Sequence, residues 1–146
     1  MGDARTGLTG ILLPRNWALS SLAGIFAIAL VGLSYVLLGF IWVSVEVLEL
    51  GTIASWLVYA LCSIAVLGAL LNGYLNDDLL VSICIAVAPL VGFGLFVGSI
   101  WILPSFDPLF DIGSTALRFG GVTVGIGVLT GFVGVRAGRT LRDHET

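Results

Sequence analysis

The sequence contains no lysine and few charges of any kind. Six arginines and nine acids give its 146 residues a net charge of −3, and charged residues make up only 10% of the chain. A soluble domain and a disordered segment both carry more charge than this, so both classes are excluded. An excess of acids also argues against a nucleic-acid partner, because neutralising phosphates requires exposed clusters of lysine and arginine. A lysine-free, acidic chain is typical of a halophile-like composition, since carboxylates stay hydrated in a high-salt cytoplasm.

The chain also lacks the residue combinations that catalysis and metal binding need. Its one histidine is His144, and its two cysteines, Cys62 and Cys84, each lie within an apolar segment. We interpret the cysteines as small, buried apolar side chains, and a disulfide or metal pair is the alternative. The apolar runs hold no Asp, Glu, His or Lys near their centres, so a proton relay has no carrier. No P-loop, dinucleotide or nucleophile–base motif is present, and we predict a protein that is not an enzyme and needs no cofactor.

Apolar residues dominate instead. They make up 58% of the chain, and the mean hydropathy is +1.13. Uncharged runs cover residues 16–45, 50–76, 79–106 and 119–135. A helix needs about 20 apolar residues to cross a hydrocarbon core of about 30 Å, and the fourth run reaches that length if it starts near Gly113 and includes Arg118. The sequence therefore predicts an all-α integral membrane protein, a bundle of four transmembrane helices.

The predicted organisation is one transmembrane domain with two short polar ends. These parts are a cytoplasmic N-terminal segment (1–16), the transmembrane domain (17–138) and a cytoplasmic polar tail (139–146). The helices are expected at 17–43, 51–75, 79–103 and 113–135. The first apolar run is too long for a signal peptide, so it is expected to be a retained helix. Asn76-Asp77-Asp78 predicts a short turn before the third helix, and short connections would pair the helices as two hairpins.

The arginines predict the orientation in the cell membrane. If both termini are cytoplasmic, only Arg118 of the six arginines lies toward the outside. The outer side then holds a polar cluster formed by Glu46, Glu49, Asp107, Asp111 and Arg118. The Arg118 side chain either reaches the interface by snorkelling or pairs with Asp111, Glu46 or Glu49.

The two halves of the chain show a weak internal similarity. Residues 49–54 match 111–116, and Ile41-Trp42 matches Ile100-Trp101. The period equals one helical hairpin, as in transporters built from tandem parallel repeats. Ordinary helix-start chemistry gives the same matches without a duplication, so both interpretations stay open.

The last helix carries the clearest pattern in the sequence. Its glycines are spaced by seven, four, three and four residues: Gly120, Gly127, Gly131, Gly134 and Gly138. At 3.6 residues per turn they form one stripe, which we call the glycine stripe, where another helix can approach closely. Gly94 and Gly98 offer a second such surface on the third helix. The partner of the stripe is either a helix of the same bundle, a second copy, or a different membrane protein.

These patterns predict a non-enzymatic protein that works by helix association through the glycine stripe. Its partners are the lipid bilayer and either a second copy, in a homo-oligomer, or a membrane complex in which it is an accessory subunit. The alternative is a small transporter or channel. In that alternative, the outer acids, Tyr35 and Tyr59 would line a cation vestibule, and Pro89 would kink or break the third helix near mid-membrane. The favoured interpretation of Pro89 is a structural kink that neighbouring helices fill.

Overall fold

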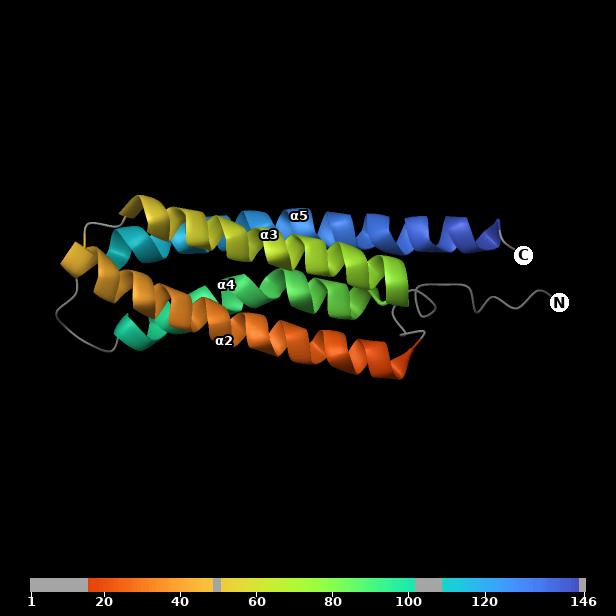
Figure 1. Cartoon of the computed structure of the whole chain (residues 1–146), viewed down its shortest axis with the longest axis horizontal. Helices are drawn as coiled ribbons and strands as arrows, with labels where there is room; N and C mark the ends of the chain where they lie inside the picture. Colours follow the sequence, from red (N-terminus) through yellow and green to blue (C-terminus); the bar gives the residue numbers. More distant parts are fainter. Residues whose placement is uncertain (1–15, 49–50, 102–108, 145–146) are drawn as a thin grey trace.

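The computed structural model describes residues 16–48, 51–101 and 109–144, and the regular structure in them is entirely helical. The helices are α2 (Trp17–Leu48), α3 (Gly51–Asn76), α4 (Leu79–Trp101) and α5 (Leu109–Asp143) (Figure 1). Each contains a segment long and apolar enough to cross a membrane: Trp17–Ser44, Ser55–Asn76, Leu79–Ile100 and Ser114–Asp143. The prediction of an all-helical protein with four potential transmembrane helices is confirmed.

The helix ends differ from the predicted ones mainly in α5. It begins earlier, at Leu109, and continues past the predicted end at Val135 to Asp143. Arg139 and Arg142 therefore lie on the helix and not in a polar tail. Basic residues in the last turns of a helix are favoured by its dipole, so the arginines that set the predicted topology also support this extension.

The four helices run alternately in opposite directions along one long axis (Figure 1). α3 packs most extensively against α5, and α2 packs mainly against α4, so the main partners run in the same direction. α4 also packs along α5, whereas α2 makes few contacts with α3. The start of α2, the α3–α4 turn and the end of α5 lie at one end of the bundle, which we call the turn end.

One side of the glycine stripe of α5 packs against α4. A Cβ atom added at Gly127 would lie 2.5 Å from Cβ of Ala86, and one added at Gly131 would lie 3.0 Å from Cβ of Ser82. Gly120 faces the next part of α4 in the same way. All of these glycines are buried, so α4 lies as close to α5 as the missing side chains allow.

The other side of the stripe packs against α3. Added Cβ atoms at Gly134 and Gly138 would collide with the backbone carbonyls of Leu70 and Tyr74. α3 contributes its own glycine, since a Cβ at Gly73 would collide with the backbone of α5. In this structure the partner of the glycine stripe is therefore the rest of the same bundle.

Adding one methyl group to the stripe will destabilise the bundle. We expect Gly134→Ala to lower the free energy of unfolding by about 1–3 kcal/mol, because the rigid α3 backbone has to move. Gly32→Ala is the control at an exposed position of α2, since its Cβ would meet nothing within 4 Å. Unfolding of both variants in mixed micelles with increasing denaturing detergent measures the difference, and equal effects would contradict the packing described here.

Candidate functional site

The predicted outer polar cluster lies largely outside the described side chains. Glu49 and Asp107 are not among the described residues, and only the backbone of Glu46 and Asp111 is described. Arg118 is exposed on α5 and forms no ion pair with another described residue. This exposure fits a side chain that snorkels to the interface. Pairing of Arg118 with any of the four acids stays a prediction.

Three features of the transporter alternative lie among the described side chains: Pro89, Tyr35 and Tyr59. α4 is helical through Pro89, which is fully buried, so the helix is not broken at this residue. Membrane helices tolerate proline because neighbouring groups satisfy the freed carbonyl. Tyr35 and Tyr59 lie half exposed on the outside of the bundle, with their rings edge-on against Phe96 and Phe119.

The two cysteines differ in their surroundings. Both are free, and Cys62 is buried, but Cys84 is exposed on α4. Cys84 therefore lies outside the protein core, because an apolar segment in a membrane helix has a lipid-facing side as well as a core side, and its predicted shielding from water stays a prediction. Within the part of the chain that the structure describes, no group of three His, Cys, Asp or Glu side chains is placed to hold a metal ion.

Polar side chains gather at the turn end, and we call this cluster the turn network. It comprises Asn16, Ser20, Asn72, Asn76, Asp77, Asp78, Ser82, Arg139 and Arg142. Asp78 is its centre and is only 1% exposed. Its carboxylate accepts hydrogen bonds from Val81 N (3.1 Å) and from Ser20 Oγ (2.7 Å). It therefore caps α4 and ties α4 to the start of α2, and these bonds offset the cost of burying the carboxylate.

Asn72 ties α3 to the same point. Its Nδ2 atom donates to the backbone oxygen of Asp78 (2.9 Å) and to Ser82 Oγ (3.0 Å). Ser82 Oγ in turn donates to the Asp78 carbonyl oxygen (2.8 Å). Because no water competes inside a membrane, buried polar groups of this kind are stable only when they bind one another. The α3–α4 turn is thus held by side chains as well as by the backbone.

Asp77 connects this turn to the end of α5. Its φ of 55° is left-handed, and its N–H donates to the carbonyl oxygen of Gly73 (3.2 Å), which ends α3. Aspartate tolerates this conformation better than most residues. The Asp77 carboxylate accepts hydrogen bonds from Arg142 Nη2, and Arg139 Nε lies 4.0 Å from Oδ1. Arg142 Nη1 also donates to the carbonyl oxygen of Tyr74 (3.4 Å).

This ion pair was not predicted from the sequence, in which Arg139 and Arg142 were interpreted as topology signals and Asp77 as part of a turn. A signal was available, because Asp77 and the two arginines lie near helix ends on the same predicted side of the membrane. Opposite charges at neighbouring helix ends favour one another, so the three residues could have been proposed as partners.

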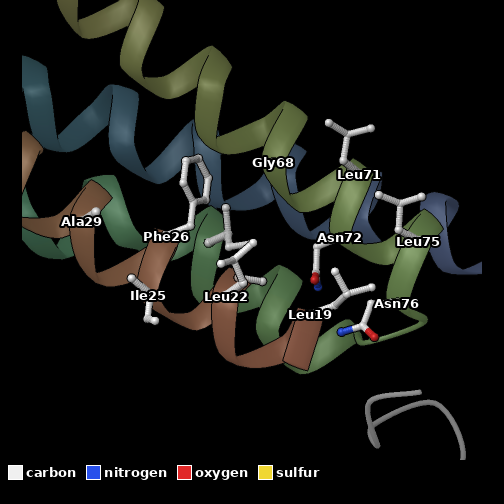
Figure 2. Close-up of a pocket in the computed structure, with 12 residues that line it drawn as sticks. Leu19, Leu22, Ile25, Phe26, Ala29, Gly68, Leu71, Asn72, Leu75 and Asn76 are labelled. Carbon is white, nitrogen blue, oxygen red and sulfur yellow. The ribbon is translucent and has the colours of Figure 1, made fainter. Parts of the chain in front are cut away.

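An apolar groove of about 480 Å³ lies between α2 and α3, beside the turn network (Figure 2). Its walls include Leu19, Leu22 and Phe26 of α2 and Gly68, Leu71 and Leu75 of α3, and Ile85 of α4 also lines it. Its volume lies within the range of about 300–1,000 Å³ of small-molecule sites. The groove exists because α2 packs mainly on α4 and leaves much of α3 uncovered.

Asn76 lines the groove at the turn end. This side chain is 1% exposed, and its Oδ1 atom accepts a hydrogen bond from Asn16 N (3.1 Å). Its Nδ2 atom has no hydrogen-bond partner among the described residues. Figure 2 shows the nitrogen turned toward Leu19 and the oxygen turned away. The groove thus combines hydrocarbon walls with one free donor at one end.

Two pairs of glycines spaced by four residues face the outside of the bundle, Gly94 and Gly98 on α4 and Gly121 and Gly125 on α5, and the single glycines Gly24 and Gly32 of α2 are equally open. A Cβ atom added at any of them would meet nothing within 4 Å. The sequence predicted the first pair as a packing surface, and no described helix packs there. The second pair has the same four-residue spacing but was not predicted, because it lies on the exposed side of α5, away from the glycine stripe. The two pairs lie on outward-facing positions of two neighbouring helices.

No protein-family model, curated protein or solved structure matches the chain. Two features of the described residues offer contacts to a partner or a ligand. They are the open glycines of α4 and α5 and the groove with its amide donor.

Removing the Asp78 carboxylate will loosen the turn end. We expect Asp78→Ala to lower the free energy of unfolding by about 1–3 kcal/mol, because α4 loses its cap and Ser20 loses its acceptor. Asp77→Asn is the control at the adjacent position: it weakens a partly exposed ion pair, which is worth up to about 1 kcal/mol. The same unfolding measurement compares the two, and a larger loss for Asp77→Asn would contradict the central place of Asp78.

Proposed function

We propose that the protein is a non-enzymatic membrane protein that works by helix association, as a homo-oligomer or as an accessory subunit of a membrane complex. The observation that carries the proposal is the open space around Gly94, Gly98, Gly121 and Gly125. The buried glycines of the stripe are explained by packing inside the bundle, and these four are not. We assign the association surface to them.

The energetic argument rests on what glycine does in a membrane helix. Within a helix, glycine is less favourable than alanine by about 1 kcal/mol. In lipid this loss is recovered where two helix backbones approach closely, because van der Waals packing is the main attraction between helices. Pairs spaced by four residues on α4 and on α5 offer such an approach to a further helix, and a second copy could use the same surface reciprocally.

We also propose the orientation with both termini in the cytoplasm. The start of α2 and the end of α5 lie at the turn end, and Arg139 and Arg142 lie there too. Arginines close to membrane helices are retained on the cytoplasmic side, which supports this orientation. The pairing of the helices as two hairpins and the internal duplication stay predictions. A duplication would make α2 and α3 correspond to α4 and α5. The α4–α5 pair packs extensively and the α2–α3 pair packs sparsely, so the packing gives the duplication no added support.

Bulky side chains at the open glycines will disrupt assembly without unfolding the bundle. We expect Gly121→Leu/Gly125→Leu, and separately Gly94→Leu/Gly98→Leu, to reduce the particle to a single chain or to release its partner, because leucine keeps the helix backbones apart. Purification in a mild detergent with measurement of mass and composition gives the result. The control is Ala60→Leu, which adds bulk at an exposed position of α3.

The proposal predicts that the Ala60→Leu particle matches the wild type. An assembly that survives both glycine double substitutions would contradict the proposed surface. A wild-type particle that is a lone chain in the native membrane extract would contradict helix association itself.

A further inference from the structure

We propose that the groove between α2 and α3 binds one hydrocarbon chain of a membrane glycerolipid, and that Asn76 Nδ2 donates a hydrogen bond to the oxygen that links this chain to glycerol. An ester carbonyl and an ether oxygen share the acceptor chemistry that this assignment needs. The proposal does not depend on oligomerisation, because the groove lies on α2 and α3 and the proposed association glycines Gly94, Gly98, Gly121 and Gly125 lie on α4 and α5.

The groove has the depth and direction of a lipid chain. Asn76 is the last residue of one candidate membrane span, and Trp17 is the first residue of another. Trp17 is 73% exposed, and tryptophan favours the headgroup level of a bilayer, so this end of the groove lies at the interface. From Asn76 to Gly68, α3 rises by about 12 Å toward mid-membrane. The groove therefore has its donor at the interface and its apolar walls toward the membrane centre.

The polar groups select a ligand with a single acceptor. Both hydrogen bonds of the Asn72 amide nitrogen are used within the turn network, which leaves Asn76 Nδ2 as the free amide donor of the groove. A buried donor without a partner is costly, so a ligand oxygen at this position is favoured over pure hydrocarbon. No cationic side chain lines the groove, and Arg142 is bound to Asp77. A charged ligand therefore has no counter-ion here.

The same donor argues for a lipid and against a transmembrane helix of another protein. In such a helix the backbone carbonyls already accept bonds from their own helix, and its lipid-facing side chains are mostly hydrocarbon. A lipid brings a free oxygen to the interface and a flexible chain to the groove. Phe26 shows that the floor admits apolar groups, because its ring lies where a Cβ atom on Gly68 would be only 2.8 Å away.

Photo-crosslinking of the full chain tests the proposal without any substitution. The protein is reconstituted in vesicles of phosphatidylcholine and phosphatidylglycerol that contain a small fraction of phosphatidylcholine with a diazirine on one acyl chain. We expect labelling of Leu22, Phe26 and Leu71 to exceed, several-fold, that of Leu129 and Val133, which are exposed on α5. Equal labelling of groove and α5 would overturn the proposal.

Lipid retention in native mass spectrometry tests the same site with variants. Ala29→Trp fills the groove from an exposed position on its wall, and Ala60→Trp is the matched control at an exposed position outside it. We expect one retained glycerolipid per chain in the wild type and the control, and a loss of about tenfold in Ala29→Trp and in Asn76→Leu. Retention that is unchanged in Ala29→Trp would overturn the groove, and unchanged retention in Asn76→Leu would overturn the role of its amide.

One further variant separates this proposal from the proposed function. Gly121→Leu/Gly125→Leu is expected to lose assembly and to keep the groove lipid. If the lipid is lost together with assembly, it binds between subunits and the groove assignment is wrong. Crosslinks from groove residues to a second protein chain, in place of lipid, would overturn the proposal as well.

Discussion

The close approach of α5 to both α3 and α4 is the contact on which the rest of the bundle depends. The backbone of α5 contacts the backbone of α3 at Gly134 and Gly138. On α3, Gly73 in turn packs against the backbone of α5. Inside a membrane the surrounding lipid is as apolar as the helix surfaces, so hydrophobic burial contributes little to helix association. Tight van der Waals contact is the main stabilising interaction instead. Because α5 takes up one side of α3 and of α4, α2 is left to pack mainly on α4. The groove between α2 and α3 is the direct result.

This contact also sets the position of the turn network. Gly138 lies against the Tyr74 carbonyl, and Arg142, one turn later, donates to that carbonyl and to Asp77. A Cβ atom at Gly138 would lie 3.1 Å from Nη2 of Arg142, so the glycine also leaves room for the guanidinium group. The ion pair therefore depends on the register that the glycines fix. At the turn end, the Asp77–Arg142 ion pair thus depends on the close packing of α5 against α3.

Sequence patterns predicted the elements of this bundle better than their partners. Uncharged runs predicted four spans, because the length of a helix in a membrane is fixed by hydrocarbon thickness. Spacing predicted that one face of α5 is a packing surface, but periodicity along one helix cannot say which helix covers it. The pairing of Asp77 with Arg142 was missed for the same reason, since it joins residues far apart in the chain. Pro89 alone could not decide between a broken and a continuous helix, because a proline signals a lost hydrogen bond and not whether neighbours compensate for it.

The order of the helices around the bundle places the two proposed surfaces apart. α2 and α3 flank the groove, while the proposed association glycines lie on α4 and α5, and the contacts run from α2 to α4, from α4 to α5 and from α5 to α3. The face formed by α4 and α5 is thus opposite the face formed by α2 and α3. A further helix that packs on these glycines would leave the groove facing the bilayer. Association and lipid binding therefore do not compete for the same surface, and each can be removed by substitutions that leave the other in place.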